Sequence, residues 1–466
     1  MKTKSKKKTL IIVLVSIAVL LVALCSAVLI VGHNLLSPMR PKGGISDDAI
    51  VETDKGKIQG RENDGVYNFL GVEYGYADHF FELPKEVEKF DGVKKATDYG
   101  PASLQASNSF SFLSSTQYSN SCQNLNIWAP EKKENLPVMV FLHGGGFSSG
   151  SSYQMDSYNG ENLAKKGNVV VTINHRLNVI GHLDLSDYGE EYQCSANVGI
   201  ADIVLALQWI KKNITSFGGN KENVTLFGQS GGGAKILALM TSPYGKGLFH
   251  KAIIQSGATE TVGVHFNSLE VSKKVTEYTM KNLGITDPKG IEELGYRKLL
   301  SASNDALSKV AMEYKIPSPF QGYSMEFEPV VDGDYIPSDP IVGDSFAENG
   351  KDITLMIGSN LFEWTKYVSS LQVEVTDDIN AEFKKAYPDK MISDARYVDT
   401  LIRVPMLKLM RAKARQAGAK IYSYVYTYGN STHGAEIPYT FNNGSGVMND
   451  MLSSLWSNFA KDGVPS

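Results

Sequence analysis

Residues 226–233, LFGQSGGG, place a serine hydroxyl among glycines directly after an apolar run. Gly228, Ser230 and Gly232 fit the pattern G-x-S-x-G, in which a serine sits on a tight turn between a strand and a helix. The backbone of such a turn is strained, and the two glycines leave room for strand and helix to pass closely. Ser230 is therefore a candidate nucleophile. The alternative is a glycine-rich turn with an incidental serine, because so short a pattern recurs by chance.

A second glycine run could supply hydrogen-bond donors for that chemistry. A serine hydroxyl attacking a carbonyl generates an oxyanion, which needs donors to stabilise it. The run HGGGF at 143–147 follows the apolar segment PVMVFLH. Consecutive glycines leave backbone N–H groups unshielded, and these can converge on one oxygen together with the N–H that follows the nucleophile. We therefore predict an oxyanion hole formed by Gly145, Gly146 and Gly231.

The serine also needs a base, and the base needs a carboxylate. His433 lies in STHGAEIPY, directly after an apolar segment that ends in YVYTY, where the chain order serine, acid, histidine places the base. Between Ser230 and His433 in the sequence, Glu363 is the first carboxylate after the apolar segment DITLMIG. It would hold the imidazole in the required tautomer. Asp332 and Asp334, in VVDGDY, compete for this role but are typical of turn residues.

The elements that must position these residues are short apolar runs with helical patterns between them. Continuous rather than alternating hydrophobicity predicts strands that are buried on both faces, as in a mainly parallel sheet. A helix is predicted over 199–213, where apolar residues recur at helical spacing, and another within 232–240. The predicted strands are 137–143, 168–174, 223–228, 250–255, 352–358 and 420–426.

The alternation of strand, helix and strand predicts an α/β fold with helices on both faces of the sheet. Near the front of the chain, 56–60 and 66–72 are typical of a small antiparallel hairpin at a sheet edge. Neither an internal repeat nor a low-complexity tract interrupts the body of the chain.

The first residues follow a different pattern. Five lysines among the first eight residues precede an uncharged apolar run over 10–31, whose 22 residues can cross a hydrocarbon core of about 30 Å as a helix. Lysines on the N-terminal side of the apolar run predict a cytoplasmic N-terminus and an extracytoplasmic body. The length favours an uncleaved signal anchor, and a cleaved signal peptide is the alternative. We therefore expect a basic tail at 1–9, a membrane segment at 10–31, a linker at 32–48 and a folded domain at 49–466, at the cell membrane or, if cleaved, secreted.

Charge and cysteine usage exclude some functions. Seven of the 46 Lys and Arg residues fall in the first 45 residues, so 39 basic residues remain against 50 acidic ones. That excess of negative charge argues against nucleic-acid binding. Only Cys122 and Cys194 lie outside the apolar run, which gives no disulfide framework and favours two small buried thiols over a single bridge.

Several stretches of the chain resemble the type B carboxylesterases of the α/β-hydrolase superfamily, a group that includes bacterial para-nitrobenzyl esterases and the cholinesterases. These stretches are YNFLGVEYG, CQNLNIWAP, FLHGGGFSSGS, VVVTINHRLNVIGHL, QWIKKNITSFGGNKENVTLFGQSGGG, EPVVDGDYIP, STHGAEIPY and WSNFAKDGVP. The resemblance covers residues 50–466 and implies an α/β-hydrolase fold with no metal or cofactor. It implies the same nucleophile, acid, base and oxyanion donors: Ser230, Glu363, His433, Gly145, Gly146 and Gly231.

The chain departs from that family at several points. Gln229 stands where the family usually has Glu, and Gly231 where it usually has Ala. The acid lies in Phe362-Glu363-Trp364 rather than in the usual Asp-Glu-Gly. The stretch from Glu363 to the histidine is shorter than usual and the chain stops early, so we expect a reduced lid and a missing C-terminal edge, either natural or from an incomplete sequence.

These observations predict a serine hydrolase that acts on a small-molecule carboxylic ester through an acyl-enzyme. A first alternative is a non-catalytic, membrane-tethered adhesion or recognition protein on the same fold, since a fold does not by itself determine function. Relatives of that kind lose the serine or its partners, whereas this chain retains all three. A second alternative keeps the triad but acts as a thioesterase, amidase or lipase. The sequence indicates neither the natural ester nor the oligomeric state.

Overall fold

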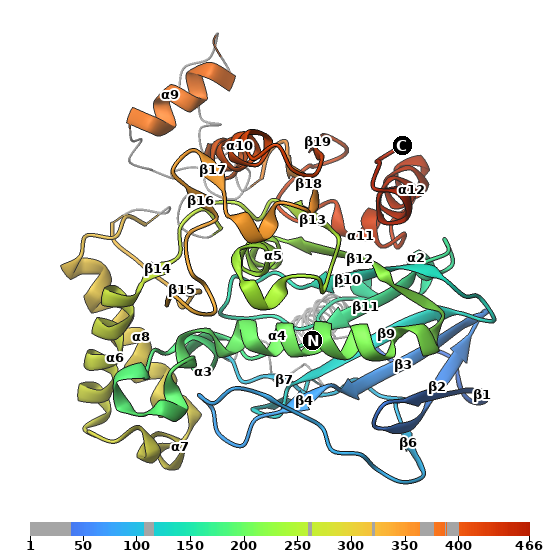
Figure 1. Cartoon of the computed structure of the whole chain (residues 1–466), viewed down its shortest axis with the longest axis horizontal. Helices are drawn as coiled ribbons and strands as arrows, with labels where there is room; N and C mark the ends of the chain where they lie inside the picture. The colour runs from blue at the N-terminus through green and yellow to red at the C-terminus, as the bar shows by residue number, and fades with distance from the viewer. Residues whose placement is uncertain are drawn as a thin grey trace, which may run out of the picture.

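The computed structural model describes residues 39–106, 116–259, 263–318, 322–363, 377–386, 388 and 400–466. The apolar segment predicted at 10–31 lies outside these residues. A sheet of eleven strands runs through the middle of the molecule (Figure 1). Ten strands follow one another across it, and β6 (Val93–Lys95) pairs with β2. In spatial order the ten are β1 (Gly44–Thr53), β2 (Gly56–Asn63), β3 (Val66–Glu73), β9 (Asn124–Pro130), β11 (Val169–Ile173), β10 (Leu136–Leu142), β12 (Gly219–Gln229), β13 (Lys251–Gln255), β18 (Thr354–Asn360) and β19 (Ile421–Tyr426).

The sheet is mixed, with a parallel part and an antiparallel part. From β11 to β19 all neighbouring strands pair in parallel. The pairs β1–β2, β2–β3, β3–β9 and β9–β11 are antiparallel, and β6 pairs with β2 in parallel. The six parallel strands are the six predicted from apolar runs, so the prediction of a mainly parallel sheet is confirmed. The predicted hairpin is β2 with β3, but β1 lies outside it and begins at Gly44, within the range 32–48 expected to be a linker.

Side chains of the central strand β10 point alternately to the two faces of the sheet. Val138, Val140 and Leu142 belong to a buried cluster with residues of α4, α5 and α10. Met139 and Phe141 point to the opposite face, into a cluster with residues of α2 and α12. Alternation along one fully buried strand thus requires helices on both faces, as predicted. The helices are α2 (Glu161–Ala164), α3 (Asn178–His182), α4 (Val198–Asn213), α5 (Gly231–Thr241), α6 (Leu269–Leu283), α7 (Ile291–Leu294), α8 (Tyr296–Glu313), α9 (Asp377–Ala386), α10 (Thr400–Arg415), α11 (Ile437–Thr440) and α12 (Val447–Asp462).

The helices α6, α7 and α8 form a separate group at one end of the sheet, while α9 stands away from the rest (Figure 1). The group buries its own apolar cluster, which it shares with α3. Eight short strands form four two-stranded pairs apart from the main sheet: β4 (Gly75–Tyr76) with β5 (Lys85–Glu86), β7 (Ala102–Ser103) with β8 (Tyr118–Ser119), β14 (Asn267–Ser268) with β15 (Val330–Val331), and β16 (Ile341–Val342) with β17 (Ser345–Phe346).

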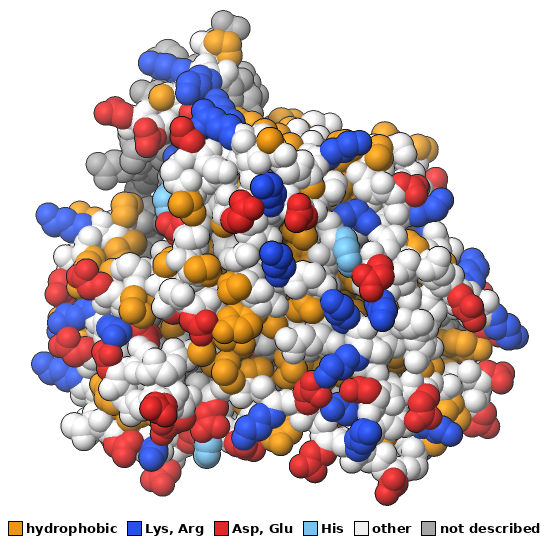
Figure 2. Space-filling view, viewed as in Figure 1, with side chains coloured by type: hydrophobic (Ala, Val, Ile, Leu, Met, Phe, Trp, Pro, Cys, Tyr) orange, Lys and Arg blue, Asp and Glu red, His pale blue; other side chains and the backbone are white. Residues whose placement is uncertain are grey.

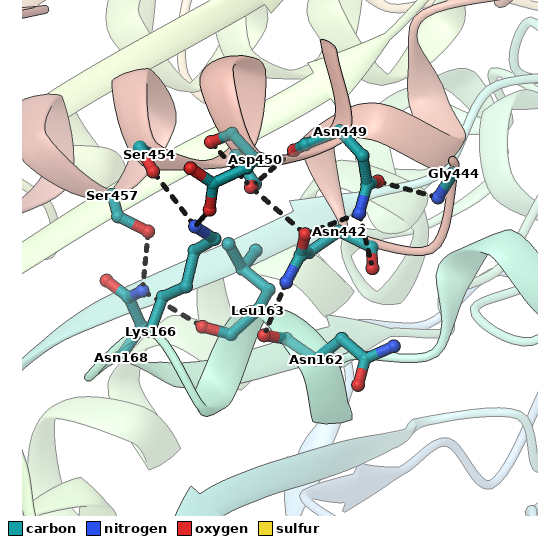
Figure 3. Close-up of polar contacts among 11 residues, drawn as sticks. Asn162, Leu163, Lys166, Asn168, Asn442, Gly444, Asn449, Asp450, Ser454 and Ser457 are labelled. Carbon is teal, nitrogen blue, oxygen red and sulfur yellow. Dashed lines mark hydrogen bonds and ion pairs between the residues drawn. The ribbon is translucent and has the colours of Figure 1, made fainter. Parts of the chain in front are cut away.

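A chain of polar contacts attaches the C-terminal helix α12 to the region of α2 (Figure 3). Lys166 Nζ lies 2.6 Å from a carboxylate oxygen of Asp450 and donates to Ser454 Oγ at 2.9 Å. Asn168 donates to Ser457 Oγ at 2.8 Å. Because Trp456 and Phe459 of α12 are buried beneath these contacts, the polar chain borders an apolar seam between helix and sheet.

Basic and acidic side chains are interspersed over the body of the molecule on the face shown in Figure 2, in line with the modest net charge of −4. None of the helices in the described part of the chain is long and apolar enough to span a membrane. Both Cys122 and Cys194 are free thiols, and Cys194 is only half-buried. The prediction of a buried thiol is therefore confirmed for Cys122, whereas Cys194 is more exposed than predicted.

Candidate active site

Ser230 occupies the turn between a central strand and a buried helix. Strand β12 ends at Gln229 and helix α5 begins at Gly231, so Ser230 alone forms the connection. Its backbone has φ 57° and ψ −127°, a strained combination for a residue with a side chain. A Cβ on Gly228 would lie 2.6 Å from the carbonyl carbon of Gly232, which explains why both positions around the serine are glycine.

The glycine loop after β10 lies against this turn. Gly145 and Gly146 have φ of 89° and 61°, a left-handed backbone that glycine adopts without strain. A Cβ on Gly231 would lie 2.5 Å from Gly146 Cα, so the loop touches the first residue of α5. Among the described residues, the backbone N–H groups of Gly145, Gly146 and Gly231 donate to no protein acceptor. Three free donors therefore lie beside the candidate nucleophile.

His433 and Glu363 meet at the ends of two neighbouring strands. Glu363 follows β18 and is fully buried, and His433 follows β19. His433 Nδ1 lies 2.6 Å from Glu363 Oε2, and the backbone N–H of His433 donates to the Glu363 carbonyl at 3.0 Å. An ionised carboxylate only accepts hydrogen bonds, so this contact places the imidazole proton on Nδ1 and leaves a lone pair on Nε2.

The other oxygen of Glu363 is held as well. Glu363 Oε1 accepts from Ser256 Oγ and from the backbone N–H of Asn360, both at 2.7 Å. Both donors follow or end strands of the parallel sheet, β13 and β18. The carboxylate therefore has a defined position and needs no displacement to bind the imidazole.

Gln229 is the residue that brings the imidazole to the serine turn. Its side-chain Nε2 lies 3.1 Å from His433 Nε2, and its side chain is buried. The amide N–H donates to the imidazole lone pair, because Nδ1 already carries the proton. Since Gln229 directly precedes Ser230, this contact holds Nε2 of His433 near the turn that carries the serine.

A second buried carboxylate lies behind the first. Glu436 accepts from Asn360 Nδ2 at 2.5 Å and from Gln255 Nε2 at 3.1 Å, and burial raises the pKa of its carboxyl. Sequence reasoning missed Glu436, Ser256 and Asn360. Only Glu436 had a signal, since it lies three residues after the histidine in STHGAEIPY.

The two competing acids are turn residues, as predicted. Asp332 Oδ1 accepts from the backbone N–H groups of Asp334 and Ile336 at 3.0 and 2.9 Å, and its other oxygen accepts from Asn197. Asp334 accepts from Tyr244 Oη at 2.9 Å. Within the described ranges, no group of three or more His, Cys, Asp or Glu side chains is arranged to hold a metal ion.

Comparison with known proteins identifies the family of the chain. The carboxylesterase family model matches residues 47–397. The para-nitrobenzyl esterase of Bacillus subtilis (strain 168) is 31% identical over 458 residues, covering 90% of this chain and 90% of that protein. A bile salt-activated lipase of Rattus norvegicus is 30% identical over 497 residues, covering 90% of this chain and 77% of the lipase.

Solved structures of esterases have the same fold. One is an esterase from the anaerobe Clostridium hathewayi that can hydrolyze aliphatic aromatic polyesters, with a TM-score of 0.74, 32% identity and 92% of each chain covered. Another is a Geobacillus stearothermophilus carboxylesterase, with a TM-score of 0.73, 30% identity, and 90% of this chain and 91% of that chain covered. The chain therefore belongs to the carboxylesterase family, with an α/β-hydrolase-like fold. It is a carboxylic-ester hydrolase.

Proposed function

We propose that this enzyme hydrolyses a small carboxylic ester through an acyl-enzyme on Ser230, with His433 as general base and Glu363 as its partner. The observation that carries the proposal is the 2.6 Å contact between His433 Nδ1 and Glu363 Oε2, which makes Nε2 the proton-accepting nitrogen of the imidazole. A neutral imidazole held in this tautomer is the state that a general base requires.

The reaction proceeds in two halves. Nε2 of His433 takes the proton of Ser230 Oγ while Oγ bonds to the ester carbonyl carbon, and the carbonyl oxygen becomes an oxyanion. The intermediate then expels the alcohol, which receives the proton from His433, and the acyl group remains on Ser230. In the second half, His433 takes a proton from water as the water oxygen bonds to the acyl carbon. The new intermediate then expels Ser230 Oγ, which receives the proton back from His433, and the carboxylic acid leaves.

The oxyanion is stabilised by the N–H groups of Gly145, Gly146 and Gly231. These donors are unpaired and lie on a rigid turn and loop, so they need no reorganisation when the negative charge develops. Removal of one such donor typically costs about 10²–10³-fold in kcat. Glu363 stabilises the imidazolium that forms during each half, and Ser256 keeps the carboxylate oriented.

Ester hydrolysis is favoured over the adhesion alternative because the relatives named above are esterases or lipases. Thioester, amide and long-chain lipid substrates need the same nucleophile and differ only in the leaving group or the acyl group. We place a short carboxylic ester first because the para-nitrobenzyl esterase matches this chain over 90% of both proteins.

The experiment compares wild type with Ser230→Ala on a short-chain chromogenic ester. Wild type is expected to release the chromophore, and Ser230→Ala to lose at least about 10³-fold in kcat because the acyl acceptor is gone. Ser454→Ala, on α12, is the matched control and retains full activity. Equal turnover by wild type and Ser230→Ala, or no turnover by wild type on any ester, would contradict the proposal.

A further inference from the structure

A lysine is buried directly behind the glycine loop. Lys235 lies on the second turn of α5 and its side chain is fully buried. Its Nζ donates to the carbonyl oxygens of His143 at 3.0 Å and Gly146 at 2.8 Å, and lies 5.2 Å from the centre of the Phe147 ring. Among the described residues no carboxylate lies within ion-pair distance of it. An ammonium group so placed is solvated by backbone carbonyls alone, which is costly and needs an explanation.

The titratable groups that face Lys235 do not offset its charge. His143 at the end of β10, His175 after β11 and His182 in α3 are all buried, and burial lowers the pKa of each, with the lysine charge as a further cause. For His143 and His182 the value falls to about 3, so they are neutral at physiological pH. Burial also lowers the pKa of Lys235 itself to about 7.

A carboxylate also lies close to the loop. Glu326 Oε2 would be 3.2 Å from a Cβ placed on Gly146, and it accepts from Ser148 Oγ at 3.3 Å. Glu326 is exposed to solvent, which screens its charge. The buried ammonium is therefore the charge with the strongest influence on the loop from within the protein.

Lys235 completes a set of four bonded carbonyls in the loop. The carbonyl of Gly144 accepts from His143 Nδ1, and that of Gly145 accepts from the backbone N–H groups of Ser148 and Ser149. Lys235 Nζ donates to the carbonyls of His143 and Gly146, which precede and follow these two in the sequence. The N–H groups of Gly145 and Gly146 share their peptide units with the carbonyls of Gly144 and Gly145, so the bonds to those two carbonyls orient the donors. Lys235 binds the carbonyls of the two flanking peptide units and thereby holds both ends of this stretch.

The absence of a side chain at Gly231 brings the loop within reach of the lysine. A methyl group there would overlap the Gly146 backbone, with Cα only 2.5 Å away, so the loop could not lie as close to α5. Gly231 and Lys235 are four residues apart and therefore share one face of the helix. Gly231 leaves room for the loop beside α5, and Lys235 donates hydrogen bonds to its carbonyls.

We propose that Lys235 is a positioning residue for the oxyanion loop, whose ammonium binds the carbonyls of His143 and Gly146 and places a positive charge behind the oxyanion donors. This inference rests on the proposed function, because it requires an oxyanion in front of Gly145 and Gly146. A charge in a site with little water stabilises a developing oxyanion far more than a neutral ester. The effect therefore falls on kcat rather than on KM.

The experiment removes the charge and keeps the volume. Lys235→Met is expected to lower kcat by about 10–100-fold while KM changes by less than about threefold. Lys413→Met is the matched control, since Lys413 in α10 is also buried and donates to two backbone carbonyls, those of Gly350 and Lys351, away from the loop. Its kcat should equal that of wild type.

A pH profile separates positioning by charge from a merely structural role. The cation exists below the pKa of Lys235, so wild-type kcat should fall as pH rises through that value. This decline should be absent from Lys235→Met and from Lys235→Gln, which has no charge but can still donate two hydrogen bonds. Lys235→Gln decides the matter if the methionine variant does not fold, as judged by circular dichroism and thermal unfolding.

The outcomes distinguish the two proposals. If Ser230→Ala is inactive but both Lys235 variants keep the kcat and pH profile of wild type, the positioning role proposed for Lys235 is overturned and the proposed function stands. If neither variant folds, Lys235 has a structural role and the inference is overturned. Equal turnover by wild type and Ser230→Ala overturns both proposals.

Discussion

The contact between Gln229 and His433 sets the properties of the general base. The amide N–H of Gln229 occupies the same Nε2 lone pair that must accept the proton of Ser230, at a distance of 3.1 Å. The amide can donate to this lone pair and carries no charge. The usual glutamate of the family would instead favour the protonated imidazole, since opposite charges attract strongly in a buried site.

Gln229→Glu should therefore shift the pH dependence of catalysis. Stabilising the protonated imidazole keeps the base inactive to higher pH, so the acid limb of the kcat/KM profile should move up by about one pH unit. Gln229→Met, which removes the amide without adding charge, is the control and should shift the limb by much less. A limb that stays in place or moves to lower pH in Gln229→Glu would contradict this account.

Sequence patterns identify single functional residues only where those residues lie within a recognisable motif. Ser230, Glu363 and His433 follow strands at positions that chain order makes recognisable. Lys235 gave no such signal, because a lysine inside GGAKILALM predicts a helix surface rather than a buried cation. Its burial depends on the loop at 143–146, which is about ninety residues away in sequence.

At the scale of elements, one buried ion pair ties together three parts of the chain. Arg176, after β11, lies 2.6 Å from Asp202 of α4, and both side chains are fully buried. Arg176 Nη1 also donates to the carbonyls of Phe80 and Glu82, both at 2.7 Å. Asp202 additionally accepts from the backbone N–H of Arg176, so the pair determines how the loop after β11 joins the helix.

Asp202→Ala should therefore destabilise the protein by about 3–5 kcal/mol, because it leaves a buried guanidinium without its counter-charge. Urea unfolding measures the change. Asp187→Ala is the control: its ion pair with Lys273 is exposed and should contribute less than about 1 kcal/mol. A loss below about 1 kcal/mol in Asp202→Ala would show that the pair does not organise these elements.

The elements themselves were predictable where hydrophobicity is continuous. All six apolar runs are strands of the parallel part of the sheet. Strand β9 was missed because its sequence, NLNIWAP, mixes polar and apolar residues although every position is buried. Asn126 within it is satisfied by Ser152, Thr172 and the backbone N–H of Gly71. Such partners come from tertiary structure, so no local pattern reveals them.

Over the whole molecule, the parallel strands collect the site from distant parts of the chain. The carboxyl ends of β10, β12, β18 and β19 are followed by the glycine loop, Ser230, Glu363 and His433 respectively. Parallel pairing brings these ends to one edge of the sheet, although the residues span about 290 positions in sequence. Chain order predicted this convergence, whereas the distances between side chains required the structure.

The proposed mechanism requires that this fold activates a single serine out of all those in the chain. A fluorophosphonate reacts with an activated serine by forming an oxygen–phosphorus bond and releasing fluoride, so mass spectrometry of the intact protein counts the reactive sites. We expect one adduct per chain, on the peptide that contains Ser230, and none in Ser230→Ala. An unlabelled wild-type protein, or an adduct on another residue, would contradict it.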